Sequence, residues 1–221
     1  MVGRSGFSGS FMDRRSEIYE KAMALFAERG YDNTPMSLVS KSLGLSKAGI
    51  YHYFESKEQL LFLTHEYFMN KNLIPILEEA EKITDPIKRI AYFIKNNTRS
   101  LASDDSGRLL IREAPRLSPE NYQVIKGIWR KVFELFRNTL NQLGREGKVK
   151  KVNPTFASFA AIGMMGWVIY WFDNTQDGSI DNLSDDFIEI FLRGILEAPV
   201  QPPRHEGPRE GQENSCTSHE E

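Results

Sequence analysis

Cysteine is almost absent from this 221-residue sequence, which contains only Cys216. A single thiol supports neither an intrachain disulfide framework nor a cysteine-based metal site. Histidine is also scarce: His65 has no second metal ligand at helical spacing, and His205 and His219 lie in a polar tail. Nucleophile elbows, phosphate-binding glycine loops and paired carboxylates are missing as well. The sequence therefore predicts that the protein is not an enzyme and needs no metal or cofactor.

Strong net charge is also lacking. The formal charge is −2, so overall charge does not by itself indicate a nucleic-acid-binding protein. Residues 37–57 differ from this average, because the segment contains three lysines and one glutamate and so has a net charge of +2. No basic and apolar leader typical of secretion opens the chain, which favours a cytoplasmic protein. Residues 1–11 are predicted to be a disordered leader or a cloning remnant, and the polar tail 199–221 is predicted to be disordered.

Long hydrophobic runs are limited to one segment, residues 156–172, which carries no charge. A membrane-spanning helix needs roughly 20 apolar residues, with about 17 as the lower limit, and this run sits at that limit. A helix that is apolar on all sides is otherwise a buried helix. We therefore interpret the segment as a buried helix and expect no association with a membrane.

No alternating strand pattern occurs, and the periodicity throughout is that of helices. Pro75 is expected to kink or end a long helix that begins at Lys57. Asp85, Ser118 and Asn153 each precede a proline and are expected to cap the helices that follow. The sequence predicts an all-α protein of about nine helices, and those after the first three cover residues 57–82, 85–102, 107–113, 118–143, 153–172 and 183–197.

The most informative stretch is residues 37–54, SLVSKSLGLSKAGIYHYF, which has the layout of a helix-turn-helix. Leu38, Val39 and Leu43 share one face of a first short helix, and Gly44 ends it. Ser46 is expected to cap a second helix, whose apolar residues Ile50 and Phe54 return to the same small core as Leu45. In such a motif the second helix enters the major groove of DNA.

The flanking sequence extends this motif. Ile18, Ala22, Leu25 and Phe26 form one stripe of a preceding helix that Gly30 can close, and Ser56 is a natural cap for the following helix. Together with LFAERGY, the Thr34 that opens the second helix, GLSKAGIYHYF and SKEQLL, the run from Arg14 to Leu63 resembles the DNA-binding region of the TetR family of bacterial transcriptional regulators. One departure is that Tyr53, preceded by His52, stands where many members carry histidine.

The resemblance implies a role in DNA binding for residues at matching positions. Lys47 and Ala48 begin the recognition helix and are expected to reach base edges, where Gly49 permits close approach. Thr34 and Ser46, at helix N-termini, are expected to act as caps, with phosphate contact equally open. Tyr53 is left open between packing and DNA contact. The full predicted set is Thr34, Ser46, Lys47, Ala48, Gly49, Tyr51, His52, Tyr53 and Lys57.

The resemblance further implies a homodimer built from the last two helices, residues 153–172 and 183–196. Gly163 and Gly166 would allow close helix approach. The second helix has an apolar stripe of Phe187, Ile188, Phe191, Leu192 and Ile195, which would form the interface or alternatively fill the core of the monomer.

Members of the family usually bind a small ligand in the larger domain, here residues 59–198, whereas residues 12–58 form the DNA-binding domain. Aromatic and methionine residues are the candidate pocket lining, with ordinary core as the alternative. They are Tyr92, Phe93, Trp129, Phe133, Phe136, Met164, Trp167, Tyr170 and Trp171. The resemblance favours a repressor that leaves a palindromic operator when a hydrophobic effector binds; an acyl-CoA ester is one candidate, with Arg108, Arg112 and Arg116 near its phosphates. The alternative is a regulator of the same fold that responds to a protein partner.

Overall fold

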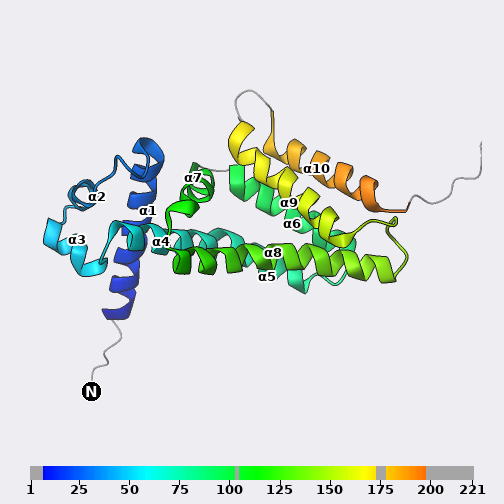
Figure 1. Cartoon of the computed structure of the whole chain (residues 1–221), viewed down its shortest axis with the longest axis horizontal. Coiled ribbons are helices and arrows are strands. Elements are labelled where there is room, and N and C mark those ends of the chain that lie inside the picture. The colour runs from blue at the N-terminus through cyan, green and yellow to red at the C-terminus, as the bar shows by residue number, and fades with distance from the viewer. Residues whose placement is uncertain (1–6, 103–104, 173–177, 198–221) are drawn as a thin grey trace, which may run out of the picture.

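The structure, a computed structural model, describes residues 7–102, 105–172 and 178–197. Figure 1 shows an elongated molecule with a small helical head, α1–α3, at one end and a larger helical bundle behind it. The predicted polar tail lies outside the described residues. The helix α1 (Phe7–Arg29) begins inside the segment predicted to be disordered, so residues 7–11 are helical rather than an unstructured leader.

The architecture is all-α, as predicted, and no strand is present among the described residues. The head consists of α1, α2 (Met36–Ser42) and α3 (Lys47–Tyr53). The bundle consists of α4 (Lys57–Phe68), η1 (Met69–Leu73), α5 (Ile74–Lys82), α6 (Pro86–Ala102), α7 (Asp105–Glu113), η2 (Ala114–Arg116), α8 (Pro119–Arg145), α9 (Pro154–Trp171) and α10 (Ile180–Ile195). Counting α4, η1 and α5 as one bent rod gives nine helices in the part of the chain that is described.

Pro75 produces the interruption that was predicted for the fourth helix. Its ring nitrogen cannot donate a hydrogen bond, and in a regular helix the ring would press against the carbonyl of Lys71. The chain accommodates this by widening into the five-residue π-helical turn η1, after which the amide of Ile74 donates to the carbonyl of Met69. The rod therefore continues through Pro75 instead of ending there.

Side-chain caps place the starts of the later helices. Asp85 accepts from the amide of Ile87 at 2.8 Å, Ser118 from that of Asn121 at 3.2 Å, and Asn153 from that of Thr155 at 2.9 Å. All three caps confirm the predicted helix starts, because each satisfies an amide that has no partner inside its helix. The last helix begins earlier than the predicted residue 183, at Ile180.

Two hydrophobic cores lie along the long axis of the molecule. The first core joins the head to the bundle, since Ile50 and Phe54 of the head share it with Leu110 of α7 and Ile125 of α8. The second core lies between α5, α6, α8, α9 and α10, around Phe93. The first core extends past the predicted domain boundary at residue 58, so the head is packed against the helices that follow it.

The apolar stripe of the last helix fills the monomer instead of forming an outer face. Phe191 and Ile195 are buried in the second core, and Phe187, Ile188 and Leu192 pack against it half-buried. The alternative that this stripe fills the core of the monomer therefore accounts for its burial, because α10 lies across α6 and turns the stripe inward. None of the helices in the described ranges is long and apolar enough to cross a membrane.

Candidate nucleic-acid interface

The turn between α2 and α3 depends on a glycine. Gly44 has a φ of +66°, and its amide donates to the carbonyl of Lys41 at 3.2 Å. The amide of Leu45 reaches back to the carbonyl of Ser40 at 2.8 Å. These two bonds close the C-terminus of α2 in a Schellman motif, which requires the left-handed conformation that glycine adopts most easily. The motif fixes the angle at which α3 leaves α2.

A Gly44→Ala substitution tests this account. A Cβ atom on Gly44 would meet nothing within 4 Å, so the cost is purely conformational. We expect the free energy of unfolding to fall by about 1 kcal/mol or slightly more, measured by urea denaturation. The matched control is Gly127→Ala in α8, which also has open space around it but lies in a helix. That control should gain about 0.5–1 kcal/mol, and equal effects at both sites would contradict the explanation.

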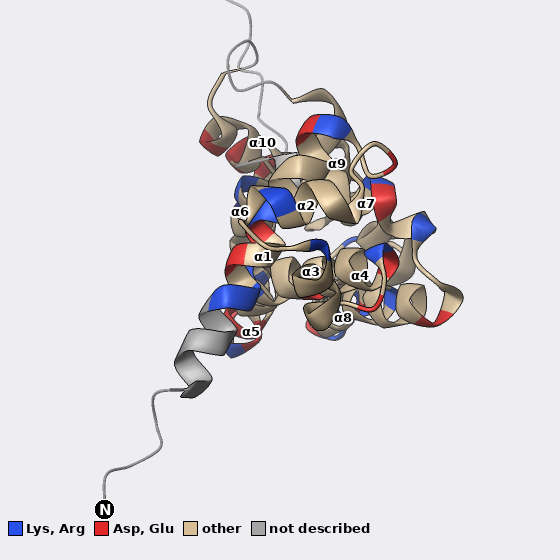
Figure 2. Ribbon diagram, turned by 90° about the vertical axis from the view of Figure 1, so that its left-hand side faces the viewer, with Lys and Arg blue, Asp and Glu red and all other residues tan. Residues whose placement is uncertain are grey.

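The helix α3 is anchored at its start and presents one face outward. The hydroxyl of Ser46 accepts from the amide of Gly49 at 2.9 Å, which confirms Ser46 as the cap. Ile50 is fully buried beneath the helix. Lys47 and Tyr51 are exposed, the latter at 44 % of its surface, and Ala48 and His52 are also exposed. Figure 2 shows α2 and α3 together at the end of the molecule that carries the head, with basic segments among them.

Gly49 and Tyr53 occupy intermediate positions on α3. A Cβ atom at Gly49 would lie 3.2 Å from the hydroxyl oxygen of Ser46, so the small residue has a role inside the cap as well as any role in approaching DNA. Tyr53 is half-buried, and its ring centroid lies 6.2 Å from that of Phe54 and 5.8 Å from that of His52. Packing therefore accounts for much of the surface of Tyr53.

Thr34 does not cap α2 and does not face outward. Its side chain is completely buried, and its hydroxyl lies within hydrogen-bond distance of the carbonyls of Gly30, at 2.8 Å, and Leu25, at 3.2 Å. Pro35 occupies the cap position and makes no side-chain bond. The predicted roles of Thr34 in capping and phosphate contact are therefore corrected to a structural one, in which it secures the end of α1 beneath α2.

Lys57 has a partner inside the protein. Its ammonium lies 4.1 Å from the centroid of the Tyr31 ring and 3.4 Å from the carbonyl oxygen of Asp32. Burial lowers the pKa of this ammonium, and the nearby Asp32 carboxylate opposes that effect. The Tyr31 ring and the Asp32 carbonyl therefore compensate the charge of Lys57 inside the protein, and its predicted contact with DNA is not needed to explain its position.

Comparison with known proteins identifies the family. A family model described as bacterial regulatory proteins of the tetR family matches residues 18–63, and one described as the tetracyclin repressor-like C-terminal domain matches residues 84–195. The chain belongs to the TetR family. This family consists of DNA-binding transcriptional regulators rather than enzymes, so the helix-turn-helix is the DNA-binding element of a regulator.

Relatives support the assignment over most of the chain. The negative transcriptional regulator IcaR of the biofilm operon icaADBC in Staphylococcus aureus is 31 % identical over 81 % of this chain and 99 % of its own. The fatty acid metabolism regulator protein of Bacillus subtilis is 23 % identical over 81 % of this chain and 94 % of its own. Among solved structures, AibR in complex with isovaleryl coenzyme A and operator DNA has a TM-score of 0.75 at 26 % identity, covering 81 % of this chain and 98 % of that chain.

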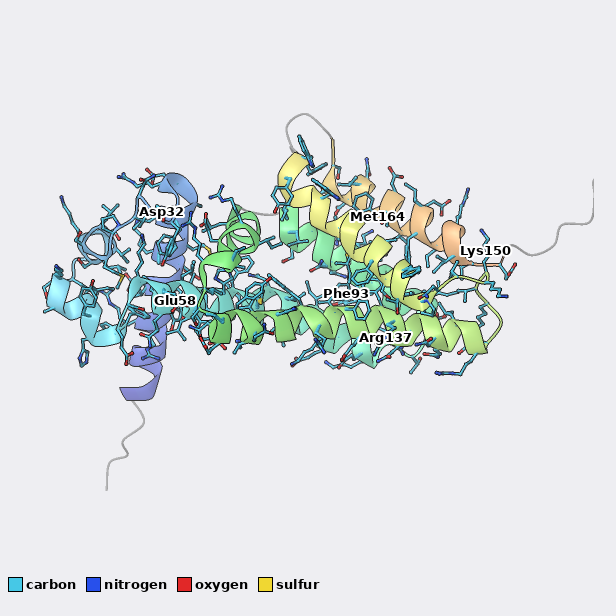
Figure 3. All side chains as sticks on the ribbon, in the orientation of Figure 1. Asp32, Glu58, Phe93, Arg137, Lys150 and Met164 are labelled. Atoms are coloured by element: carbon cyan, nitrogen blue, oxygen red, sulfur yellow. The ribbon has the colours of Figure 1, made fainter. Side chains whose placement is uncertain are left out.

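In this TetR-family chain, polar contacts tie the head to the bundle at residues that the sequence did not indicate. Arg116 of η2 makes a two-pronged ion pair with Asp32 of the head, with N···O distances of 2.9 and 2.7 Å. Arg116 also pairs with Glu113 at 2.5 Å. Within the bundle, Glu58 at the start of α4 accepts from the backbone amide of Ser118, which precedes α8, at 2.9 Å; Asp32 and Glu58 are labelled in Figure 3. A movement of α7 or α8 would therefore pull on the head.

His65 lies at the centre of this junction and was missed as a structural residue. It is fully buried in α4, with Nδ1 2.9 Å from the carbonyl of Leu61 and Nε2 2.7 Å from that of Leu110 in α7. Burial lowers the pKa of the imidazole, while the two carbonyls and the nearby Glu113 oppose the shift less strongly. A neutral imidazole donates from only one nitrogen, so protonation would change how α4 and α7 are joined.

The lowered pKa predicts loss of stability on acidification. The unfolded chain binds a proton on His65 at a higher pH than the folded chain does. The contribution of His65 is therefore complete above its unfolded pKa and decreases as the pH falls through about 6.5 toward the folded pKa. We expect the free energy of unfolding of the natural chain to fall more between about pH 7.5 and 5.5 than that of His65→Gln. Equal slopes in the natural chain and in His65→Gln would contradict the assignment.

The residues predicted to line the effector pocket separate into three groups. Phe93 and Phe136 are buried in the second core with ring centroids 5.5 Å apart, and Tyr92 and Met164 pack half-buried against that core (Figure 3 labels Phe93 and Met164). Trp129 and Phe133 of α8 are half-buried beside a surface groove. Of the arginines considered for coenzyme A phosphates, Arg116 is occupied by the ion pairs at the head. The side chain of Arg108 lies outside what the structure describes.

The remaining three predicted pocket residues lie on the outside. Trp167, Tyr170 and Trp171 are 50–74 % exposed on α9 and make ring contacts only with one another among the described residues. The prediction that they line an internal pocket is therefore wrong. The helix period places them together, as expected, but the packing of α9 on α6 and α8 turns that face outward.

Proposed function

We propose that the protein is a homodimeric repressor that binds a palindromic operator and leaves it when a small hydrophobic effector binds. The observation that carries this proposal is the outer face of α3, where Lys47, Ala48 and Tyr51 project from a helix fixed by the Gly44 turn and the Ser46 cap. Rigid presentation of short and basic side chains suits readout of base edges in the major groove. Contacts of the Tyr51 and His52 side chains with the phosphates of the DNA backbone would set the position of α3 in the groove.

Dimerisation is supported by the uncovered face of α9. One head reads too few base pairs to specify an operator, and two heads related by symmetry read half-sites about one helical turn apart. The aromatic residues on α9 are too exposed for a protein that stays monomeric. A Cβ atom added to Gly163 or Gly166 on the same helix would meet no other atom within 4 Å, which leaves space for a partner helix.

An effector site is supported by polar groups in the interior. The hydroxyls of Thr64 in α4 and Thr98 in α6 are fully buried and have no hydrogen-bond partner among the described residues. Buried hydroxyls are normally satisfied, so these two are available to a bound molecule. Thr64 adjoins His65 at the junction, so a ligand that bonds Thr64 would bias the position of α4 and of the head.

Repression and the type of effector rest on the relatives. IcaR is named a negative regulator, and AibR was crystallised with isovaleryl coenzyme A. Occupancy of a promoter is enough for repression, and an acyl-CoA ester supplies the hydrophobic group that ligand pockets usually bury. We therefore place short and medium acyl-CoA esters first among the effectors to be tried.

The experiment that tests the proposal is selection of genomic fragments bound by the purified protein at near-physiological salt, followed by footprinting. We expect an inverted repeat that overlaps a promoter, and release of the fragment by at least one member of an acyl-CoA series. Enrichment of no common sequence by the ligand-free protein would contradict the DNA-binding assignment. If an inverted repeat is enriched but no small molecule releases the protein from it, the repressor assignment stands and the effector proposal fails. Control by a protein partner would then be favoured.

A further inference from the structure

The outer face of α9 is a continuous apolar stripe. Its members recur at helical spacing and are at least half exposed: Phe156, Phe159, Trp167, Tyr170 and Trp171. Their spacing places them on one side of the helix, opposite Ala161, Met165 and Val168 in the interior. Among the described residues no helix covers this stripe. Its apolar surface is therefore available to another molecule.

A groove with basic walls runs along one side of the stripe, between α8 and α9. It has a volume of about 530 Å³, and its floor is aromatic, because Phe133 of α8 and Phe159 of α9 meet with ring centroids 5.2 Å apart. Three basic residues and one acidic residue line it: Lys126, Arg130, Arg137 and Glu134. The guanidinium of Arg137, labelled in Figure 3, lies 5.5 Å from the Phe133 ring centroid. None of these three cations forms an ion pair with a described residue.

The other side of the stripe adjoins α10, which is acidic. This helix has four acidic residues and one arginine, for a net charge of −3. Asp181 and Asp185 point back to α6, where they pair with Arg99 and Lys95. Asp186 and Glu189 are exposed, and Glu189 pairs only with Arg193 of its own helix among the described residues. The segment 126–137 of α8 has the opposite net charge, +3, from four basic residues and one acidic residue.

The symmetry needed to read a palindrome determines how two such faces meet. Both heads must lie at the same end of the dimer, so the two-fold axis runs along the long axis of the molecule. Figure 1 shows α9 between α10 and α8 along that axis. A rotation about the axis exchanges the two sides of each face. It brings α9 of one copy against α9 of the other, and α10 of one copy over α8 of the other.

We propose that a second copy of this chain inserts its acidic α10 into the basic α8–α9 groove, so that α8 is a third helix of the dimer interface. This inference rests on the homodimer proposed above and specifies its register. Asp186 and Glu189 of each copy face Arg130 and Arg137 of the other, above the aromatic floor. Complementary charge of this kind sets register and partner choice more than it adds affinity. Because α8 also carries Ile125 in the first core, the pairing connects the dimer contact to the head.

Charge reversal on the two sides tests the register. One variant carries Arg130→Glu and Arg137→Glu, the other Asp186→Lys and Glu189→Lys. Each homodimer then opposes like charges, and we expect its dissociation constant at low salt to rise by about tenfold or more. Mixing the two variants restores opposite charges at both contacts of a heterodimer. Analytical ultracentrifugation should then give a dissociation constant within about threefold of the natural one.

The control is Lys131→Glu, a charge reversal on α8 outside the groove, which should leave dimerisation unchanged. If the natural chain remains monomeric at micromolar concentration, the proposed homodimer itself is contradicted. If both charge-reversed variants dimerise normally, only the proposed register is overturned. The same holds if both variants dimerise more weakly but mixing them does not restore the natural dissociation constant. Loss of effector release in the α8 variant with unchanged dimerisation would assign the groove to a small anion and likewise overturn the register.

Discussion

Lys47→Ala is expected to weaken operator binding more than any other single substitution in the head. Lys47 is exposed at the first position of α3, where its ammonium can donate to guanine O6 or N7. Loss of such a contact costs about 1–3 kcal/mol in each half-site, so the dissociation constant of the dimer should rise by at least roughly 30-fold. The variant should also tolerate base changes at the position it no longer reads, as measured by binding to a set of single-base operator variants.

Two comparisons make this prediction specific. Tyr51→Phe removes only a hydroxyl from the same outer face and should weaken binding to all sequences alike, because a phosphate contact carries no base information. Lys151→Ala removes the same charge at an exposed position outside the head and should leave operator affinity nearly unchanged. A Lys47→Ala protein that retains the natural base preference would show that α3 is not the reading helix.

Gly163→Lys is expected to abolish dimerisation without harming the monomer. Gly163 is exposed on the α9 stripe, and a Cβ there meets nothing within 4 Å in the single chain. Replacing a helical glycine should stabilise the monomer by up to about 1 kcal/mol, while the lysine side chain blocks close approach of a second α9. Two linked heads bind at least about 100-fold more tightly than one, so operator affinity should fall by that factor.

The control for this substitution is Gly127→Lys, the same change at an exposed helical glycine of α8 that does not line the groove. Sedimentation should show a dimer for this control and a monomer for Gly163→Lys, with equal or higher melting temperatures for both. A Gly163→Lys protein that still sediments as a dimer would place the interface elsewhere and contradict the role assigned to the α9 face.

The head is the part of the molecule that the sequence specifies most completely. Its signals are local: Gly44 supplies a positive φ, Ser46 accepts from an amide three residues later, and Ile50 and Phe54 mark the inner face by their spacing. Pro75 is equally local, because the missing donor disturbs the helix wherever the rest of the chain lies. Such features depend on neighbours within five residues, so the order of residues is sufficient to predict them.

Residues whose roles depend on distant partners were not predictable in this way. Thr34 looks like a cap in sequence, but the end of α1 buries it. His65 and Arg116 appear unremarkable until the folded chain brings the Leu110 carbonyl and Asp32 to them. The sequence contains one signal for this junction. His65 follows Leu61 by four residues on an apolar helix face, which places its ring near the Leu61 carbonyl.

The sequence by itself determined an all-α chain, most of its caps and turns, and a helix-turn-helix with a defined outer face. The tertiary structure decided which apolar stripes are inside. The stripes of α9 and α10 are both periodic. Only the packing of α10 on α6 shows that Phe191 is core, and only the packing of α9 on α6 and α8 shows that Trp167 is surface. Helical period fixes which residues share a face, but the direction of that face is set by the helices packed against it.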